Sequence, residues 1–144
     1  MKFKSNSFKW RDLMEGKRSV LAELVLDEDM VTDELLRDHL APYVGLSRTQ
    51  DRIVPKPEFL DLPQAKRILL YLLARHGMVR LKVEGASLSA KTGKIAETCL
   101  IPQKSCVETL SRLKADGMIA KEKDGWAIPA HSLLRVASEL GAKR

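Results

Sequence analysis

Residues 103–116 alternate apolar and polar side chains with the period of an α-helix. The positions that share one helical face are Cys106, Thr109, Leu110 and Leu113. The side chains on the remaining faces are Gln103, Lys104, Ser105, Val107, Glu108, Ser111 and Arg112. A glutamine amide can make two hydrogen bonds to adenine, a lysine can donate to guanine, and a valine can contact the methyl group of thymine. The spacing therefore predicts a helix with one buried stripe and a polar outer face, which could contact base edges or be simply solvated.

Two β-prone runs follow this helix, at residues 118–123 and 126–128. The pair Asp124-Gly125 stands between them and predicts a tight hairpin turn, in which both turn positions need positive φ. Lys121 and Lys123 alternate to one side of the first run, where their charges suit a phosphate backbone. Trp126 is expected to pack at the base of the hairpin, because a tryptophan usually buries much of its area.

Further elements must hold these two segments in place. A helix is expected to begin near Pro63, which suits a first helical turn, and to end at Gly77, a common helix stop. Inside a second helix, Ile95, Ala96 and Cys99 are expected to face the core. The remaining elements expected in this half of the chain are a half-buried strand at 78–83, a loop at 84–91, and helices at 92–99 and about 130–140.

The first sixty residues are expected to form a separate helical region. Residues 1–17 interleave aromatic and basic side chains, which suits an arm on nucleic acid or a terminus pinned by its aromatics. Apolar spacing predicts helices at about 19–25 and at 33–41. The prolines of residues 45–63 interrupt any period and predict a linker or an extended bridge. The expected domains are therefore an N-terminal helical region with a Pro-containing linker, 1–60, and a second domain, 61–144.

The positive charge of the chain is concentrated in the second of these domains. The whole chain has 25 Lys and Arg against 19 Asp and Glu, a net charge of +6. Residues 1–60 are close to neutral, so the positive excess lies in residues 61–144. A basic domain attracts polyanions and is typical of proteins that bind phosphate backbones, although many domains have a basic surface that is merely solvated.

Other kinds of chemistry find little support in the sequence. No apolar run is long enough to span a membrane and no signal-peptide core follows the basic N-terminus, so a cytoplasmic protein is expected. Cys99 and Cys106 fall at apolar helical positions and are expected to be buried free thiols. The three histidines are far apart in sequence, and residues 91–95 lack the spacing of a phosphate-binding loop. We therefore expect no enzyme activity, metal or cofactor.

The order helix, strand, helix, turn, helix, hairpin, helix resembles the winged helix-turn-helix superfamily over about residues 62–140. Residues 93–99, GKIAETC, are similar to the first motif helix, and residues 100–102, LIP, stand where the tight turn lies. Residues 103–119, QKSCVETLSRLKADGMI, are similar to a recognition helix that runs into the wing. Two departures are Leu100, where the family often has glycine, and a longer loop at 84–91. The resemblance implies a mainly α fold with a small β-hairpin, preceded by the N-terminal helical region.

The resemblance also implies a function, the binding of double-stranded DNA by a transcription regulator. The recognition helix, 103–116, would enter the major groove and the basic wing, 118–128, would meet the backbone. The expected contact residues are Gln103, Lys104, Ser105, Val107, Glu108, Arg112, Lys121, Lys123 and Lys94. The N-terminal helices would serve dimerisation, giving a homodimer, or ligand sensing. Two alternatives stay open: a winged helix that binds a protein within a replication or transcription assembly, and a replication or plasmid-maintenance initiator.

Overall fold

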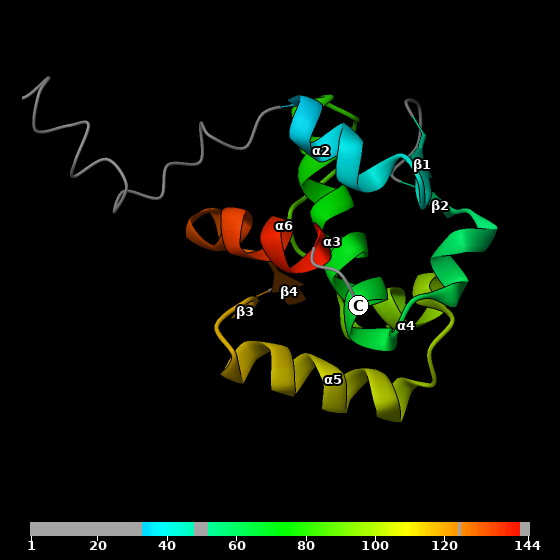
Figure 1. Ribbon diagram of the computed structural model, residues 1–144. Helices are drawn as coiled ribbons and strands as arrows, with labels where there is room; N and C mark the ends of the chain where they lie inside the picture. The colour runs from blue at the N-terminus through cyan, green and yellow to red at the C-terminus, as the bar shows by residue number, and fades with distance from the viewer. Residues whose placement is uncertain (1–32, 48–51, 124, 142–144) are drawn as a thin grey trace, which may run out of the picture.

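The computed structural model describes residues 33–47, 52–123 and 125–141, and within them the chain is mainly helical with two small antiparallel hairpins (Figure 1). The N-terminal arm at 1–17 and the helix expected at 19–25 lie outside the described residues. The first described elements are α2 (Asp33–Leu40), β1 (Val44–Leu46), β2 (Ile53–Pro55), the 3₁₀ helix η3 (Pro57–Asp61) and α3 (Gln64–Arg80). The later elements are α4 (Thr92–Cys99), α5 (Gln103–Ala115), β3 (Ala120–Glu122), β4 (Gly125–Ala127), η4 (Ala130–Ser132) and α6 (Leu133–Gly141).

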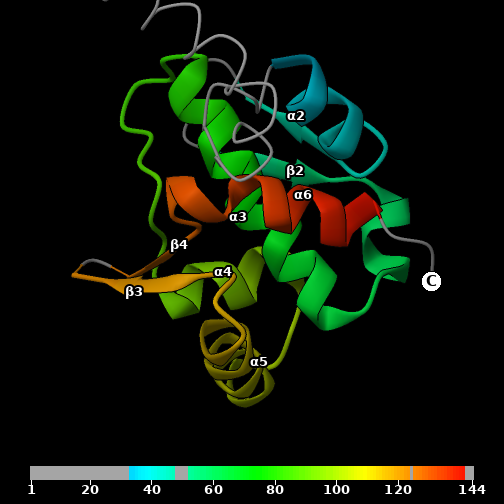
Figure 2. The same cartoon turned by 60° about the vertical axis from the view of Figure 1, so that its left-hand side comes forward.

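Helix α3 is the centre of the molecule. It contacts α2, α4, α5 and α6, and Figures 1 and 2 show it running through the middle of the fold. Every residue from Ile68 to Met78 is buried, including the polar Arg75 and His76. Arg75 Nε donates to the Ser87 carbonyl at 2.9 Å, and His76 Nε2 lies 2.8 Å from the Ile128 carbonyl. These bonds offset the cost of burying polar groups inside an apolar helix cluster.

The expected helix stop at Gly77 and the strand expected at 78–83 are both wrong. Helix α3 continues through Gly77 to Arg80, and Lys82, with φ 60°, follows in a turn. A Cβ at Gly77 would lie 3.2 Å from Leu46 Cδ1, so the side chain of Leu46 on β1 packs close to the helix at this glycine. Leu81 is 51% exposed while Met78 and Val83 are buried. The alternation seen in the sequence therefore comes from a helix end and a turn.

The described residues of the segment 45–63, for which a linker or an extended bridge was expected, form short strands and a 3₁₀ helix. Strands β1 and β2 pair antiparallel in a hairpin, with Val44 opposite Pro55 and Leu46 opposite Ile53. Pro57 opens η3, and Pro63 stands at the N-cap of α3. Among the described residues before 60, five side chains are buried in the hydrophobic core: Leu36, Leu40, Val44, Ile53 and Phe59. The domain boundary at 60/61 stays a prediction, and the core crosses it.

Helices α4 and α5 and the turn between them follow the sequence expectation closely. Helix α4 spans the expected residues, and α5 ends at Ala115, one residue earlier than expected. Leu100 takes the left-handed conformation, φ 56° and ψ 51°, in which glycine is favoured. The amide of Ile101 then donates to the Ala96 carbonyl at 3.0 Å and closes the turn. The last helix is divided into η4 and α6, the latter ending at Gly141.

The β3–β4 hairpin is present, but its turn differs from the expected one. Glu122 pairs with Gly125, so Gly125 belongs to β4 and is not a turn residue. Its φ is 144°, and a Cβ there would collide with the Ala90 carbonyl. Ala90 lies this close because it forms a β-bridge with Trp126. The Ala90 amide donates to the Trp126 carbonyl at 2.9 Å, and the Trp126 amide donates to the Ala90 carbonyl at 2.8 Å. The glycine is therefore required by a third chain segment, residue 90, and not by the turn.

Candidate nucleic-acid interface

Helix α5 has one buried face, as its sequence period predicted. Cys106 and Leu110 are fully buried, and Thr109 and Leu113 are nearly so. This stripe packs against α3 and α4. The helix lies at the edge of the molecule with no element beyond it, at the end opposite α2 (Figures 1 and 2). Its other faces are therefore open to a partner.

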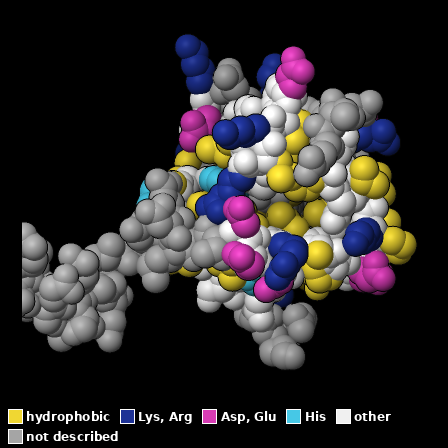
Figure 3. All heavy atoms as spheres, turned by 90° about the horizontal axis from the view of Figure 1, so that it is seen from above, with side chains coloured by type: hydrophobic (Ala, Val, Ile, Leu, Met, Phe, Trp, Pro, Cys, Tyr) yellow, Lys and Arg dark blue, Asp and Glu magenta, His cyan; other side chains and the backbone are white. Residues whose placement is uncertain are grey.

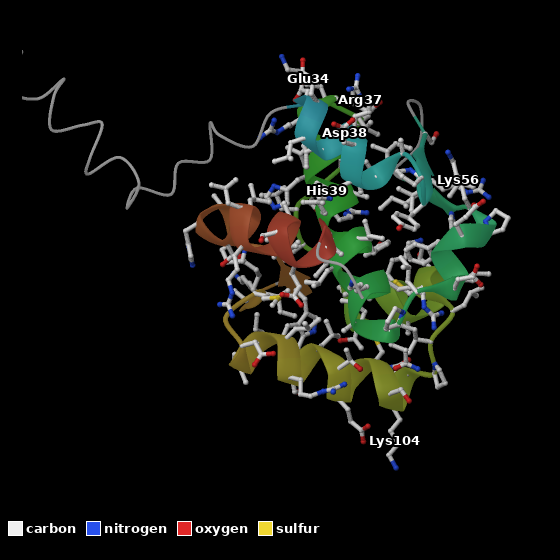
Figure 4. All side chains as sticks on the ribbon, in the orientation of Figure 1. Glu34, Arg37, Asp38, His39, Lys56 and Lys104 are labelled. Carbon is white, nitrogen blue, oxygen red and sulfur yellow. The ribbon has the colours of Figure 1, made fainter. Side chains whose placement is uncertain are left out.

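The predicted contact residues of α5 are exposed, with one exception. Ser105 is half-buried, whereas Gln103, Lys104, Glu108 and Arg112 are exposed and Val107 is 45% exposed. Figure 4 shows Lys104 pointing away from the body of the molecule. Arg112 Nη2 lies 3.4 Å from Thr109 Oγ1, a long hydrogen bond that holds the guanidinium beside its own helix. The start of α5 therefore presents freely exposed polar side chains, whereas Arg112 is held beside its own helix.

The N-terminal ends of α4 and α5 carry no negative charge. In both helices no side chain caps the first turn, and the turn contains no acidic residue. Each first turn instead contains a lysine, Lys94 in α4 and Lys104 in α5. The first amides of a helix have no partner within it, and the helix dipole places positive partial charge there. Helix α2, in contrast, begins with Asp33 and Glu34. The α4 and α5 starts therefore suit a phosphate group, and the starts of α3 and α6 share the absence of acidic residues.

The β3–β4 hairpin is attached to the start of α4 through Trp126. The indole is buried, as expected, and its Nε1 donates to Thr92 Oγ1 at 3.0 Å. Lys121 Nζ lies 5.0 Å from the centroid of the same ring, a cation–π distance. Lys123 is exposed beyond the end of β3. The hairpin thus presents two lysines from a base that the indole holds in position.

Acidic residues interrupt the positive charge of this surface. The exposed cations of α4, α5, β3 and the residues next to them are Lys91, Lys94, Lys104, Arg112, Lys114, Lys121 and Lys123. The exposed acids of the same segments are Glu97, Glu108, Asp116 and Glu122. Cations outnumber acids, but they do not form one uninterrupted stripe. A polyanion would therefore be held by particular lysines, since the field is locally mixed.

Lys94 lies among residues that the sequence did not single out. It lines a pocket between α3, α4 and β2 together with Arg52, Tyr71 and Arg75. Arg52 precedes β2 and Lys94 lies on α4, while Tyr71 and Arg75 lie on α3, whose apolar period predicted only burial. No local signal in the sequence connects these residues, because the fold alone brings them together.

The opposite end of the molecule carries an apolar hollow. Seen from the α2 side, apolar side chains gather there between charged ones (Figure 3). The hollow has a volume of about 280 Å³, and its lining includes Leu36, Leu40, Val44 and Leu46 together with the ion-paired Arg80 and Asp33. Glu34, Arg37 and Asp38 extend from α2 on this side, far from Lys104 (Figure 4). The two ends of the molecule therefore differ in chemistry.

The two cysteine thiols, Cys99 and Cys106, are buried in the hydrophobic core. Burial raises the pKa of the Cys99 thiol to about 12 and also raises the pKa of Cys106, so both stay protonated and weakly nucleophilic at neutral pH. In the part of the chain that the structure describes, no three His, Cys, Asp or Glu side chains come together as metal ligands. Over the same residues no helix has both the length and the apolar character that crossing a bilayer requires.

Comparison with known proteins identifies no relative. No protein-family model, curated protein or solved structure matches the chain. The geometry described above is therefore the basis for the function proposed below.

Proposed function

We propose that the protein binds double-stranded DNA as a winged helix-turn-helix, with α5 as the recognition helix and β3–β4 as the wing, and that it regulates transcription. The observation that carries the proposal is the position of α5. An exposed helix at the edge of the fold begins without acidic residues and is followed by a hairpin that bears exposed lysines. The order of α3, the bridge at Ala90, α4, α5 and the hairpin supports the same assignment.

The dimensions of α5 suit a DNA groove. Its 13 residues extend over about 20 Å at 1.5 Å per residue. The major groove of B-DNA is roughly 12 Å wide and admits an α-helix. In this docking Gln103 and Lys104 approach base edges, Val107 lies one turn further along the groove, and Lys123 meets a phosphate. Glu108 follows Val107 on the same helix. Its negative charge would repel a phosphate, and its carboxylate would accept a hydrogen bond from cytosine.

A mutational comparison tests the proposal, after a preferred site has been selected from random duplexes. Q103A and K104A are expected to lower the preference for that site over a scrambled duplex by roughly 1–3 kcal/mol per lost bidentate contact. K123A is expected to weaken binding to both duplexes and to reduce the salt slope by about 0.9. Affinities measured by fluorescence anisotropy at two salt concentrations separate the two effects.

Arg37→Ala is the matched control, because it removes one exposed positive charge from α2 at the opposite end of the molecule. It is expected to leave both affinities close to wild type. If Q103A, K104A and K123A all behave like R37A, the α5 surface does not read DNA. The exposed Val107 and Leu100 on α5 and its turn would then favour a protein partner at this surface.

A further inference from the structure

The β3–β4 hairpin is attached to the rest of the fold at two levels. At its base, Ile119 and Ile128 flank the two strands and are buried in the core. Beyond this base the strands pair with each other, and among the described elements their backbones make only slight contact with any helix. The second attachment, which involves Trp126, therefore fixes where the body of the hairpin lies.

Trp126 joins the hairpin to the segment that leads into α4. Its backbone amide and carbonyl both bond to Ala90, and its indole Nε1 donates to the Thr92 hydroxyl at 3.0 Å, a normal length for such a bond. The ring is only 7% exposed. Because Thr92 is the first residue of α4, the indole bond connects the hairpin to the helix itself.

Lys121 lies on the same face of the hairpin as the indole. It stands directly opposite Trp126 in the strand pairing, and its Nζ is 5.0 Å from the ring centroid. A cation at this distance is attracted to the face of an indole. The position of the indole therefore also influences where the lysine ammonium lies.

We propose that Trp126 is a positioning residue for DNA binding, and that its hydrogen bond to Thr92 holds the wing in place relative to α4 and α5. The proposal rests on the function proposed above. Helix α5 packs against α4, so a wing fastened to α4 keeps a fixed place beside α5. The wing lysines would then meet phosphates as α5 enters the groove, without the entropic cost of ordering the hairpin on binding. Neither Trp126 nor Thr92 has to touch DNA for this effect.

Two substitutions break the bond while keeping most of the packing. T92V removes the acceptor and preserves the shape of the side chain, and W126F removes the donor. In the full-length protein, both are expected to weaken binding to the selected site and to the scrambled duplex equally, by several-fold. The salt slope is expected to fall by about 0.9 for each phosphate contact that the wing loses. The preference between the duplexes is expected to remain, because α5 supplies the base contacts.

Rescue and a double-mutant cycle separate positioning from a general loss of stability. T92S keeps the hydroxyl and is expected to bind as wild type does. K123A is expected to weaken binding in wild type but to add little in the T92V background, because the displaced wing has already lost that contact.

K56M is the matched control. It removes a positive charge and the hydrogen bond from Lys56 Nζ to the Ala41 carbonyl, 2.6 Å long, on the side of the molecule away from the hairpin (Figures 1 and 4). It is expected to lower the melting temperature and to leave both DNA affinities close to wild type.

The free protein tests the bond itself, without DNA. The chain has two tryptophans, so ¹⁵N labelling gives two indole N–H signals, and W10F identifies the signal of Trp126. Buried, hydrogen-bonded protons exchange with water only when the structure opens locally. The Trp126 indole proton is therefore expected to exchange at least about tenfold faster in T92V than in wild type or T92S.

The positioning role is overturned if T92V binds both duplexes as wild type does, if it lowers the site preference as much as Q103A, or if K123A and T92V weaken binding independently. It is also overturned if the indole proton exchanges at the same rate in T92V, because the bond would then not hold the hairpin. If wild type itself binds no duplex, the proposed function fails and the positioning role fails with it. Normal binding by wild type and by both variants removes the positioning role alone.

Discussion

Helices α3 and α5 have similar apolar periods in the sequence but opposite surroundings in the fold. Helix α3 is covered by α2, α4, α5 and α6, so eleven consecutive residues are buried whatever their type. Helix α5 packs mainly on α3 and α4, so its apolar stripe is buried and its polar faces stay open. An apolar period thus shows the smallest face that must be buried. The number of neighbouring elements decides whether the other faces are buried too.

This difference also separates the polar residues of the two helices. Arg75 and His76 of α3 are inside the protein and direct their side chains at backbone carbonyls. Lys104 and Glu108 of α5 are in solvent. Buried polar groups need partners from the protein or a ligand, whereas exposed ones are free to meet a macromolecule. The polar residues of α3 therefore belong to the interior of the protein, whereas those of α5 are available to a partner.

The largest loss of stability is expected from removing the elements before residue 60, which pack against α3. A fragment of residues 60–144 lacks five buried side chains of the core, each of which contributes about 1.5–3 kcal/mol when buried. Whole domains are stable by only about 5–15 kcal/mol. We expect the fragment to melt at a much lower temperature than the full chain, as circular dichroism would measure. A cooperative melt close to that of the full chain would instead establish residues 61–144 as a self-sufficient domain, as the sequence boundary implies.

A smaller effect is expected from one truncated side chain on each helix. Leu72 of α3 is fully buried, and L72A is expected to lower the free energy of unfolding by about 2–5 kcal/mol. Val107 of α5 is 45% exposed, and V107A is expected to change the free energy of unfolding by no more than about 0.5 kcal/mol. Urea denaturation of both variants measures the contrast. Equal losses would mean that α5 is covered by something on its outer face.

The smallest change in stability is expected from replacing a glycine inside a helix, Gly77, and one that follows a helix, Gly117. Gly77 lies within α3, where alanine is favoured by about 1 kcal/mol, and only the terminal methyl of the half-buried Leu46 has to move for a Cβ. We expect G77A to raise the free energy of unfolding by about 0.5 kcal/mol. Gly117, after α5, has φ 81°, so G117A is expected to lower it by about 1–2 kcal/mol. A loss in G77A as large as that in G117A would restore the helix stop expected from the sequence.

The sequence by itself determined α4, the turn after it, and α5 with its inward stripe. The period of residues 103–116, the short helix before it and the break at Leu100-Ile101-Pro102 are local signals, and the observed α4 and α5 follow them. Buried Trp126 and the buried thiols were also predictable, since residue type and helical phase are enough to place such side chains inside. These features depend on interactions between residues a few positions apart.

Only the tertiary structure decided the roles of the glycines and prolines and the composition of the α4 pocket. Gly77 resembles a helix stop until β1 is packed against it, and Gly125 resembles a turn residue until Ala90 is placed beside it. Prolines that suggested a linker or an extended bridge end a strand, open η3 and precede α3. Arg52, Tyr71 and Lys94 share a pocket because three elements converge. A glycine in the sequence indicates that another segment can approach the backbone closely, and only the fold shows which segment does so.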